Sequence, residues 1–588
     1  MKARLFALIC KAASWVAVAA LAGTPAPLHA QGWYRRMAGS QGIIGIGHGY
    51  TAAELDFRHH PFLARTRPRG TDEYFNHRLS YWPASISTPC GELFSSDGSD
   101  LFDQYGAVVQ NGNRLSSYGR RGETGAFNAR AGALFVPAGA RAMWLFSALQ
   151  DPRLSSNPVD SVNHPPLCYA ELDIAGNRVI RKRVWLTAEG TTTVAATHHA
   201  NKLDFWVISR PLNRSRFLCF LATDREVRPV PVISRVASFA DSASHFQFSP
   251  DGRWLVYTAC TDSLPVSRLA SRKLRTYLAR FDNATGVVSQ ERMLWQDSVW
   301  TRAAFSPDSR LLYLSVSDGA GYLYQYDVTA DDPTDLWNNA RLLATGITQF
   351  IAPLDLVATP QGQILLAGVQ GFTNPDPNDP IGIITQPNLR DTACAIRHRV
   401  VAEVPYMARR IPIPNAINSL LFDTIPAIRY VAGCGSDSVR LALVNACATS
   451  VSWDFGDPTS GAANISAAWQ PRHTFSASGI YVVSATTDTG QNFRTRVRYE
   501  STAGVVLPNV ITPNHDGLND TFLPLPAASG PYGLRIFNRW GAEVFATTEP
   551  TAGWDAATVA DGVYFYFLTS TDCAGMPLSR RGTLTVVR

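Results

Sequence analysis

Short apolar runs that follow turn residues recur through the first two thirds of the chain. Six such turns begin at Thr88, Val136, His199, Ser249, Ser306 and Thr359. They recur about every 50 to 60 residues, and a repeat of this length with several short strands is typical of a β-propeller blade, which stacks on its neighbours to bury both faces. The pattern predicts a propeller of about seven blades over residues 31–425. We expect N- and C-terminal strands to share a blade, which would hide the sheet edges.

Two shorter segments follow with the alternation of small half-buried strands. One pattern runs through Ile480 and Val482, and another through Val563 and Phe565. Clusters of Asn, Asp and Gly between such runs supply tight turns. We therefore expect an all-β fold, an N-terminal β-propeller followed by two small immunoglobulin-like β-sandwiches. The predicted boundaries are 1–30 for a leader, 31–425 for the propeller, 426–504 for the first sandwich and 505–588 for the second.

The composition fits several turn-rich β domains and gives no sign of a nucleic-acid partner. A chain of 588 residues is too long for one core, and its 43 Gly and 37 Pro suit short strands joined by turns. The 53 basic and 47 acidic residues nearly balance. Lys and Arg occur in pairs and not in long runs, so we do not expect nucleic-acid binding.

The N-terminal residues have the pattern of a secretory signal peptide. Lys2 and Arg4 precede an apolar stretch, and small residues lead to a predicted cleavage between Ala30 and Gln31. The apolar stretch is too short to span a bilayer. No later stretch approaches the roughly 18 apolar residues of a membrane-spanning helix, so we expect no transmembrane segment in the mature chain.

Eight cysteines remain after removal of the leader, which contains Cys10. Export to an oxidising compartment permits disulfides. We expect Cys434 to pair with Cys447 within one small domain, and the alternative is that the cysteines are buried free thiols. No Cys or His spacing indicates a zinc site.

Sequence motifs for catalysis are missing. We find no G-x-S-x-G, H-E-x-x-H or P-loop pattern, and no helical periodicity follows the glycines of residues 42–50, which argues against nucleotide binding there. A propeller can still gather catalytic groups from several blades. The candidates are His198, His199, Asp204, His245 and Asp318. Each lies in or beside a turn, where a structural role is commoner, so we expect a protein without enzymatic activity and no cofactor.

The last segment carries four motifs in a characteristic order. They are LPNVITPNHDGLNDTF (507–522), LRIFNRWGAEVF (534–545), GWD (553–555) and DGVYFYFL (561–568). This segment resembles the gliding-motility-associated C-terminal domain of Bacteroidetes surface proteins, a type B sorting domain. The residues that match the family pattern are Asn514, Asp516, Gly517, Asn519, Asp520, Trp540, Gly541 and Trp554. Ala556 departs from it, because the family usually has Gly there.

The resemblance implies recognition by the type IX secretion machinery at the outer membrane, and export through the periplasm to the cell surface or the medium. The same motif raises the question of calcium. Asn514, Asp516, Asn519 and Asp520 place oxygen donors close together on a loop bent by glycine, as calcium sites do. The alternative is a network of Asx turns, in which these side chains bond to their own backbone.

The other two segments carry looser resemblances. VSWDFGDPTSG (451–461) with HTFSASGIYVV (473–483) resembles the polycystic kidney disease (PKD) domain. In that reading Trp453 fills the core, and Asp454 or Asp457 accepts backbone hydrogen bonds at a turn or, alternatively, binds a metal. FSPDGRWLVY (248–257) resembles a propeller-like region of Bacteroidetes exported proteins.

Together these patterns indicate an exported, non-catalytic binding or adhesion protein. We expect the propeller to bind a carbohydrate or protein ligand and the first sandwich to act as a spacer. Two alternatives stay open: a propeller enzyme, hydrolase or lyase, that degrades an extracellular polymer, and a component of the gliding or secretion apparatus.

Overall fold

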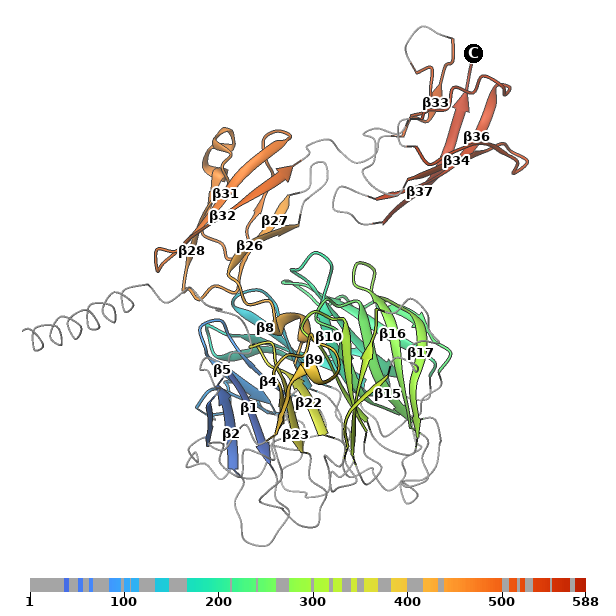
Figure 1. Ribbon diagram of the computed structural model, residues 1–588. Coiled ribbons are helices and arrows are strands. Elements are labelled where there is room, and N and C mark those ends of the chain that lie inside the picture. Colours follow the sequence, from blue (N-terminus) through green and yellow to red (C-terminus); the bar gives the residue numbers. More distant parts are fainter. Residues whose placement is uncertain are drawn as a thin grey trace, which may run out of the picture.

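The computed structural model describes residues 36–41, 51–56, 63–66, 84–96, 100–105, 107–115, 133–147, 166–211, 214–238, 242–260, 274–297, 301–316, 321–329, 340–345, 354–368, 382–398, 416–431, 438–499, 507–514, 519–523, 532–549, 552–571 and 577–588. Almost all regular structure in these ranges is β-strand (Figure 1). The predicted signal peptide, with Ala30 and Gln31, lies outside them. No helix in the described ranges is both long and apolar enough to cross a membrane.

The N-terminal part is a succession of antiparallel sheets. Two three-stranded sheets come first: β1 (Arg36–Gln41), β2 (Thr51–Asp56) and β3 (Leu63–Thr66), then β4 (Ala84–Ser87), β5 (Leu93–Ser96) and β6 (Leu101–Phe102). A seven-stranded sheet holds β7 (Ala133–Pro137), β8 (Ala142–Ser147), β9 (Pro166–Asp173), β10 (Arg178–His198), β11 (Phe205–Pro211), β12 (Arg216–Ala222) and β13 (Val232–Arg235).

Three four-stranded sheets follow. The first holds β14 (Ser242–Phe248), β15 (Trp254–Cys260), β16 (Leu274–Asp282) and β17 (Val287–Asp297), and the second β18 (Thr301–Phe305), β19 (Leu311–Val316), β20 (Tyr322–Asp327) and β21 (Arg341–Thr345). The third holds β22 (Leu354–Ala358), β23 (Ile364–Gly368), β24 (Gly382–Ile384) and β25 (Ile396–His398), with the 3-10 helix η4 (Asp391–Cys394) in its last turn.

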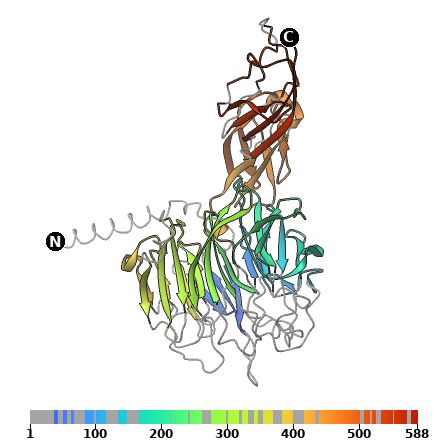
Figure 2. The ribbon, with the colours of Figure 1, turned by 90° about the vertical axis from the view of Figure 1, so that its right-hand side faces the viewer.

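These sheets stand side by side around a common centre, as in a propeller (Figures 1 and 2). The 21-residue β10 pairs with β9 through its first half and with β11 through its second, so it ends one unit of the ring and begins the next. Successive contacts run from β1 to β4, β7, β10, β14, β18 and β22, which are therefore the inner strands. The described fold is all-β with an N-terminal propeller, as predicted. The number of blades stays a prediction.

Each of the six predicted turns forms the first hairpin of one unit of this ring. The turns join β4 to β5, β7 to β8, β10 to β11, β14 to β15, β18 to β19, and β22 to β23. Neighbouring units are also joined by a recurring hydrogen bond from the second strand. Trp144 Nε1 donates to Thr223 O and Trp206 Nε1 to Asn283 O, both at 2.9 Å. The sequence repeat thus corresponds to one structural unit because its turn chemistry is local.

The expected closure of the ring by a shared blade stays a prediction. No sheet among the described strands combines strands from the two ends of the propeller. Instead, one apolar cluster joins Ile86 and Phe94 near the start to Leu365 and Ile383 near the end. The short helix α3 (Asn418–Leu421) belongs to this cluster through Leu420. Side-chain packing therefore links the two ends of the ring.

Helix α3 covers one end of the ring. It contacts the inner strands β10 and β14 where they finish. Asn418 Nδ2 donates to Phe248 O at 2.8 Å, and Ser419 Oγ accepts from the His198 backbone N–H at 3.0 Å. The six repeat turns follow the same ends of the inner strands, so α3 and these turns share one end of the propeller.

The middle domain consists of two sheets around one core. One sheet holds β26 (Ala427–Val431), β27 (Val439–Val444) and β30 (Arg472–His473). The other has the order β29 (Ile465–Ser466), β28 (Val451–Asp454), β31 (Gly479–Thr487) and β32 (Asn492–Tyr499), with the 3-10 helix η6 (Pro458–Asn464) beside it. Trp453 is 1% exposed in the core that both sheets share, as predicted. The PKD assignment stays a prediction.

The C-terminal domain is one five-stranded sheet. Its order is β33 (Val510–Ile511), β37 (Pro577–Val586), β36 (Gly562–Thr571), β34 (Gly533–Phe537) and β35 (Glu543–Thr547), with β33 parallel to β37. Phe522 and Trp554 pack on one face of this sheet. The predicted domain boundaries and the immunoglobulin-like class stay predictions.

Candidate functional site

A disulfide joins the propeller to the middle domain. Cys90 lies in the turn between β4 and β5, and Cys447 follows β27. Their Cα atoms are 4.7 Å apart although the residues are separated by 357 positions. The expected partner of Cys447 was therefore wrong: it is Cys90 and not Cys434, which lies outside the described residues. Cys434 is close to Cys447 in the sequence, but the docking of the two domains brings Cys447 to the distant turn that contains Cys90.

A buried arginine from the middle domain binds two propeller carboxylates at this junction. Arg440 on β27 donates from Nη2 to Asp204 Oδ2 at 2.6 Å and from Nη1 to Asp224 Oδ1 at 2.7 Å. The three side chains are each about nine-tenths buried. Burial alone would lower the pKa of Arg440, but the hydrogen bonds and charge of Asp204, followed by Asp224, raise it. The guanidinium is therefore a fixed positive charge that holds both domains.

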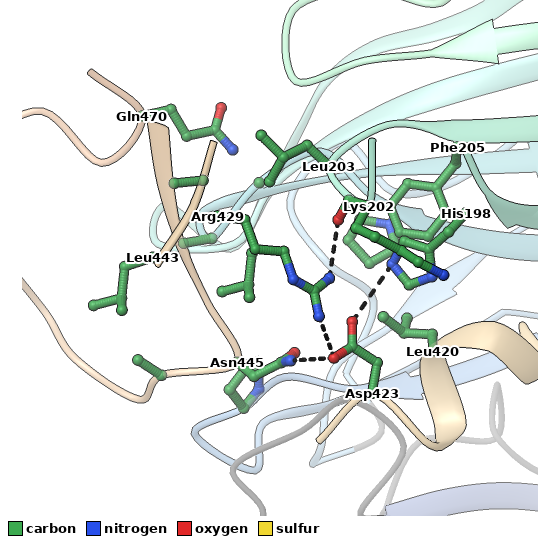
Figure 3. Close-up of a pocket in the computed structure, with 17 residues that line it drawn as sticks. His198, Lys202, Leu203, Phe205, Leu420, Asp423, Arg429, Leu443, Asn445 and Gln470 are labelled. Carbon is green, nitrogen blue, oxygen red and sulfur yellow. Dashed lines mark hydrogen bonds and ion pairs between the residues drawn. The ribbon is translucent and has the colours of Figure 1, made fainter. Parts of the chain in front are cut away.

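A second arginine of the middle domain, Arg429, also contacts the propeller, near α3 (Figure 3). Arg429 on β26 donates from Nη1 to Lys202 O at 2.9 Å, and its Nη2 bonds to Asp423. The other Asp423 oxygen lies 3.8 Å from His198 Nε2. Burial lowers the pKa of His198 to about 3 despite Asp423, so this histidine is neutral at physiological pH. Its ring stacks on Phe205 with centroids 4.5 Å apart.

The pocket between these groups is too small for a typical ligand. It measures about 60 Å³, whereas small-molecule sites are about 300–1,000 Å³. Its walls come from both domains, with Lys202 and Phe205 on the propeller side and Leu443 and Asn445 on the other (Figure 3). The propeller and the middle domain therefore pack closely here and leave only a small cavity between them.

The C-terminal loop motif is tied together by its own backbone. The Thr512 N–H donates to Asn519 O at 2.8 Å, and the Asn514 N–H donates to Asp520 Oδ1 at 3.1 Å. Asn519 takes the left-handed conformation with φ 54°, which Asn tolerates better than most residues. Asp516 and Gly517 lie outside the described residues. The described contacts join residues 512–514 to residues 519–520.

The two motif tryptophans occupy opposite environments. Trp554 is 4% exposed, exchanges two backbone hydrogen bonds with Phe522 and packs edge-on against Tyr564. Trp540 is 81% exposed in the turn between β34 and β35, beside Gly541 at φ 81°. Trp554 therefore stabilises the domain, whereas Trp540 presents an indole to solvent.

Ala556 adopts φ 52° and is fully buried. Glycine adopts this left-handed conformation more easily than any other residue. Alanine therefore adopts this left-handed conformation at a cost in backbone strain.

Residues 505–586 match the CHU_C type IX secretion signal domain. This match covers the loop motif, both tryptophans and the whole five-stranded sheet. The chain is a cargo of the type IX secretion system. Its destination is therefore the cell surface or the extracellular medium. No curated protein sequence matches the cargo.

Solved structures resemble the cargo only weakly. A putative 6-phosphogluconolactonase from Bacteroides uniformis has 12% identity, covers 62% of this chain and 96% of its own, and gives a TM-score of 0.36. The β-propeller domain of Cps50 (Swd1) from Myceliophteria thermophila has 15% identity, covers 57% and 94%, and gives 0.31.

Three of the five predicted catalytic candidates lie together in the cargo, at the turn between β10 and β11. His198 contacts Ser419, His199 Nδ1 accepts from the Asn201 N–H at 3.0 Å, and Asp204 binds Arg440. His245 lies on a different inner strand, with Nε2 near the Ala303 backbone. Asp318 lies outside the described residues. The described contacts are those of a docking surface.

No three His, Cys, Asp or Glu side chains gather in the described ranges to hold a metal ion. Calcium at Asn514, Asp516, Asn519 and Asp520 stays a prediction. Asp457, the other metal alternative, accepts hydrogen bonds from the Ser476 N–H at 2.9 Å and from His473 Nε2 at 3.1 Å. Burial would raise the pKa of Asp457, but these bonds, with those from the Ser476 and Thr459 hydroxyls, hold it at about 2. Asp454 Oδ1 accepts from the Gly456 N–H, so both carboxylates accept backbone hydrogen bonds as expected.

The residues that hold the junction were missed by sequence reasoning. One signal was available for Arg440, which interrupts an otherwise apolar strand, VRLALV. A charge within such a strand indicates a buried partner. Asp224 and Cys90 lie in ordinary turns and carry no comparable signal.

Proposed function

We propose that the cargo is a non-catalytic binding protein of the cell surface or medium, in which the propeller carries the recognition surface. The observation that supports this most directly is the joint with the middle domain. A disulfide, two buried ion pairs on Arg440 and the contacts of Arg429 fix the propeller on its support. A rigid scaffold that presents loops is the usual basis of recognition.

The joint also favours one end of the propeller for binding. Helix α3 and the middle domain occupy the end that carries the six repeat turns. In this proposal the ligand binds at the opposite end, which points away from the support.

The inner strands support a binding role over catalysis. Their described residues are mostly Ser, Thr, Ala and apolar, and Asp355 is the one Asp or Glu among β1, β4, β7, β14, β18, β22 and residues 191–198 of β10. Polymer-degrading sites commonly use paired carboxylates. The ligand in our proposal is a carbohydrate or a surface protein.

Binding and turnover are measured on the same mature protein. A glycan array and purified surface proteins report binding, while product release from the bound polymer reports catalysis. We expect binding without product. Release of reducing ends or unsaturated fragments would contradict the non-catalytic role.

Two cellular experiments test the export part of the proposal. Deleting residues 505–588 is expected to leave the remainder folded but retained in the periplasm, and normal amounts in the medium would contradict this. Deleting the whole protein should leave secretion of other cargo and gliding intact. A general loss of either would place the protein in the apparatus instead.

A further inference from the structure

The sheet of the C-terminal domain has one covered face and one open face. Its central strand β36 lies between β37 and β34 (Figure 1), and alternate side chains of a strand point to opposite faces. On the covered face, Tyr564 and Leu568 are buried in the domain core. On the open face, the exposed fractions are 50% for Val563, 45% for Phe565 and 42% for Phe567. Three large apolar side chains in succession therefore face solvent from the middle of the sheet.

This run is set apart from the other exposed apolar residues. In the described ranges, no other strand exposes three large apolar side chains at alternate positions, and the nearest case is the pair Ile480 and Val482 on β31. A strand with one solvated face normally alternates apolar with polar residues, whereas a strand covered on both faces is apolar throughout. The segment VYFYFL of β36 is of the second kind. Its composition therefore favours a partner on the open face.

The neighbouring strands extend this apolar strip and add charge at one end. The register places Arg535 and Arg581 on either side of Phe567. The guanidinium of Arg535 lies over the ring of Phe537, with 5.1 Å between its Cζ atom and the ring centroid, and forms an ion pair with Glu543. Arg581 is exposed on the other side of Phe567. A complementary surface is therefore apolar along the strip, with a hydrogen-bond acceptor opposite Arg581.

We propose that this open face, with Val563, Phe565 and Phe567 at its centre, is the surface by which the type IX secretion machinery binds its cargo. The occupant follows from the domain, because the face lies within residues 505–586, which match a type IX secretion signal domain. Exposed apolar patches rimmed by polar residues mark interaction sites, and aromatic residues and Arg are enriched in protein interfaces.

This inference rests on the export part of the proposed function and goes further in two respects. It gives the place on the sorting domain that the machinery contacts. It also gives the chemistry of the partner, an apolar surface with an acceptor group for Arg581.

The test measures export of the full-length protein in cells that carry the type IX system, as the ratio of exported to periplasmic protein. Phe565→Ser/Phe567→Ser is expected to lower this ratio at least about tenfold, since loss of a central aromatic anchor commonly weakens an interface by about that factor or more. The matched variant Ile480→Ser/Val482→Ser removes exposed apolar side chains from the middle domain and should be exported like the wild type. Limited proteolysis of the periplasmic chains reports whether each variant is folded.

Phe567→Glu provides a second test if the double variant does not fold. The new carboxylate would lie between Arg535 and Arg581, so the domain should tolerate it, but it places a charge in the apolar strip. We expect a loss of export of at least about tenfold. The proposal is overturned if Phe567→Glu and a folded Phe565→Ser/Phe567→Ser are both exported like the wild type.

Deletion of residues 505–588 separates this inference from the proposed function. If the deletion stops export and the open-face variants do not, the domain keeps its sorting role but another of its surfaces carries it, and the inference fails alone. If the deletion leaves export unchanged, both fail. The alternative occupant is a second copy of the chain. A dimer of the mature protein that Phe565→Ser/Phe567→Ser dissociates in sedimentation, together with normal export, would assign the face to that copy and overturn the proposal.

Discussion

Replacing Arg440 by Met tests whether the propeller and the middle domain behave as one unit. The substitution keeps an unbranched apolar stem but leaves the buried carboxylates of Asp204 and Asp224 without their cation. Asp204 Oδ1 already has no hydrogen-bond partner in the described structure. Breaking a buried ion pair by removing one partner costs about 3–5 kcal/mol, whereas an exposed pair contributes about 1 kcal/mol or less.

The measurement is calorimetric unfolding of the mature protein, with Arg178→Met as the control. Arg178 is 59% exposed in its pair with Asp173. An unfolding entropy of about 2.1 cal/mol/K per residue, over the propeller and middle domain together, predicts a melting temperature lower by about 3–5 °C for Arg440→Met and by about 1 °C or less for the control.

The pH dependence gives a second check on the same variant. Without the cation, the two buried carboxylates are costly only while they are charged. Protonation removes that cost, so the loss of stability should shrink as the pH falls from about 7 toward about 4, the range in which a buried carboxylate binds a proton more readily than the unfolded chain does.

A melting temperature for Arg440→Met within about 1 °C of the wild type would refute the reasoning, since about 3 °C is the smallest shift expected. The variant Arg440→Met/Asp204→Asn/Asp224→Asn separates charge from packing. It should recover most of the loss, because replacing a whole buried ion network is far less costly than leaving it half paired. Without recovery, the loss comes from the packing of the arginine stem.

Three further outcomes follow from the structure. Peptide mapping under non-reducing conditions should find the Cys90–Cys447 bond, and Cys90→Ser/Cys447→Ser should cost about 2–5 kcal/mol in denaturant unfolding; a Cys434–Cys447 peptide would contradict the described junction. Trp554→Ala should lower the free energy of unfolding by about 3–5 kcal/mol. Trp540→Ala should lower it by less than about 0.5 kcal/mol but should reduce export, and normal secretion of both variants would remove Trp540 from the sorting signal. Asp457→Asn should destabilise the middle domain above about pH 4 and lose its effect as the pH falls toward 2, because the folded pKa of Asp457 lies below the unfolded value of about 3.9; urea unfolding at pH 7 and pH 2 compares the two.

The features that could be predicted from the sequence depend on neighbouring residues. The Ser-Pro-Asp-Gly turn at Ser249 fixes a hairpin by itself, since Gly252 takes φ 72° and its N–H bonds back to Ser249 O. The core position of Trp453 follows from alternation along a short strand. These patterns are read directly from adjacent positions.

The features that could not be predicted depend on how domains dock. Arg440 and Asp224 are 216 positions apart, and no local pattern pairs them. Trp540 and Trp554 belong to equally recognisable motifs, yet one is exposed and the other buried. Alternation does not distinguish a turn that faces solvent from a strand that faces a core.

The Cys90–Cys447 bond joins the second sheet of the ring to a domain made after the ring is complete. Its two sulfur atoms meet in the native chain only when every intervening sheet is in place and the support has docked. The presence of this disulfide therefore indicates that the propeller has folded and that the middle domain has docked on it. On a gel without reductant, the disulfide-bonded chains should migrate faster. The fraction of periplasmic chains in this band would measure how many have completed folding, and its time course would give the rate of folding in the cell.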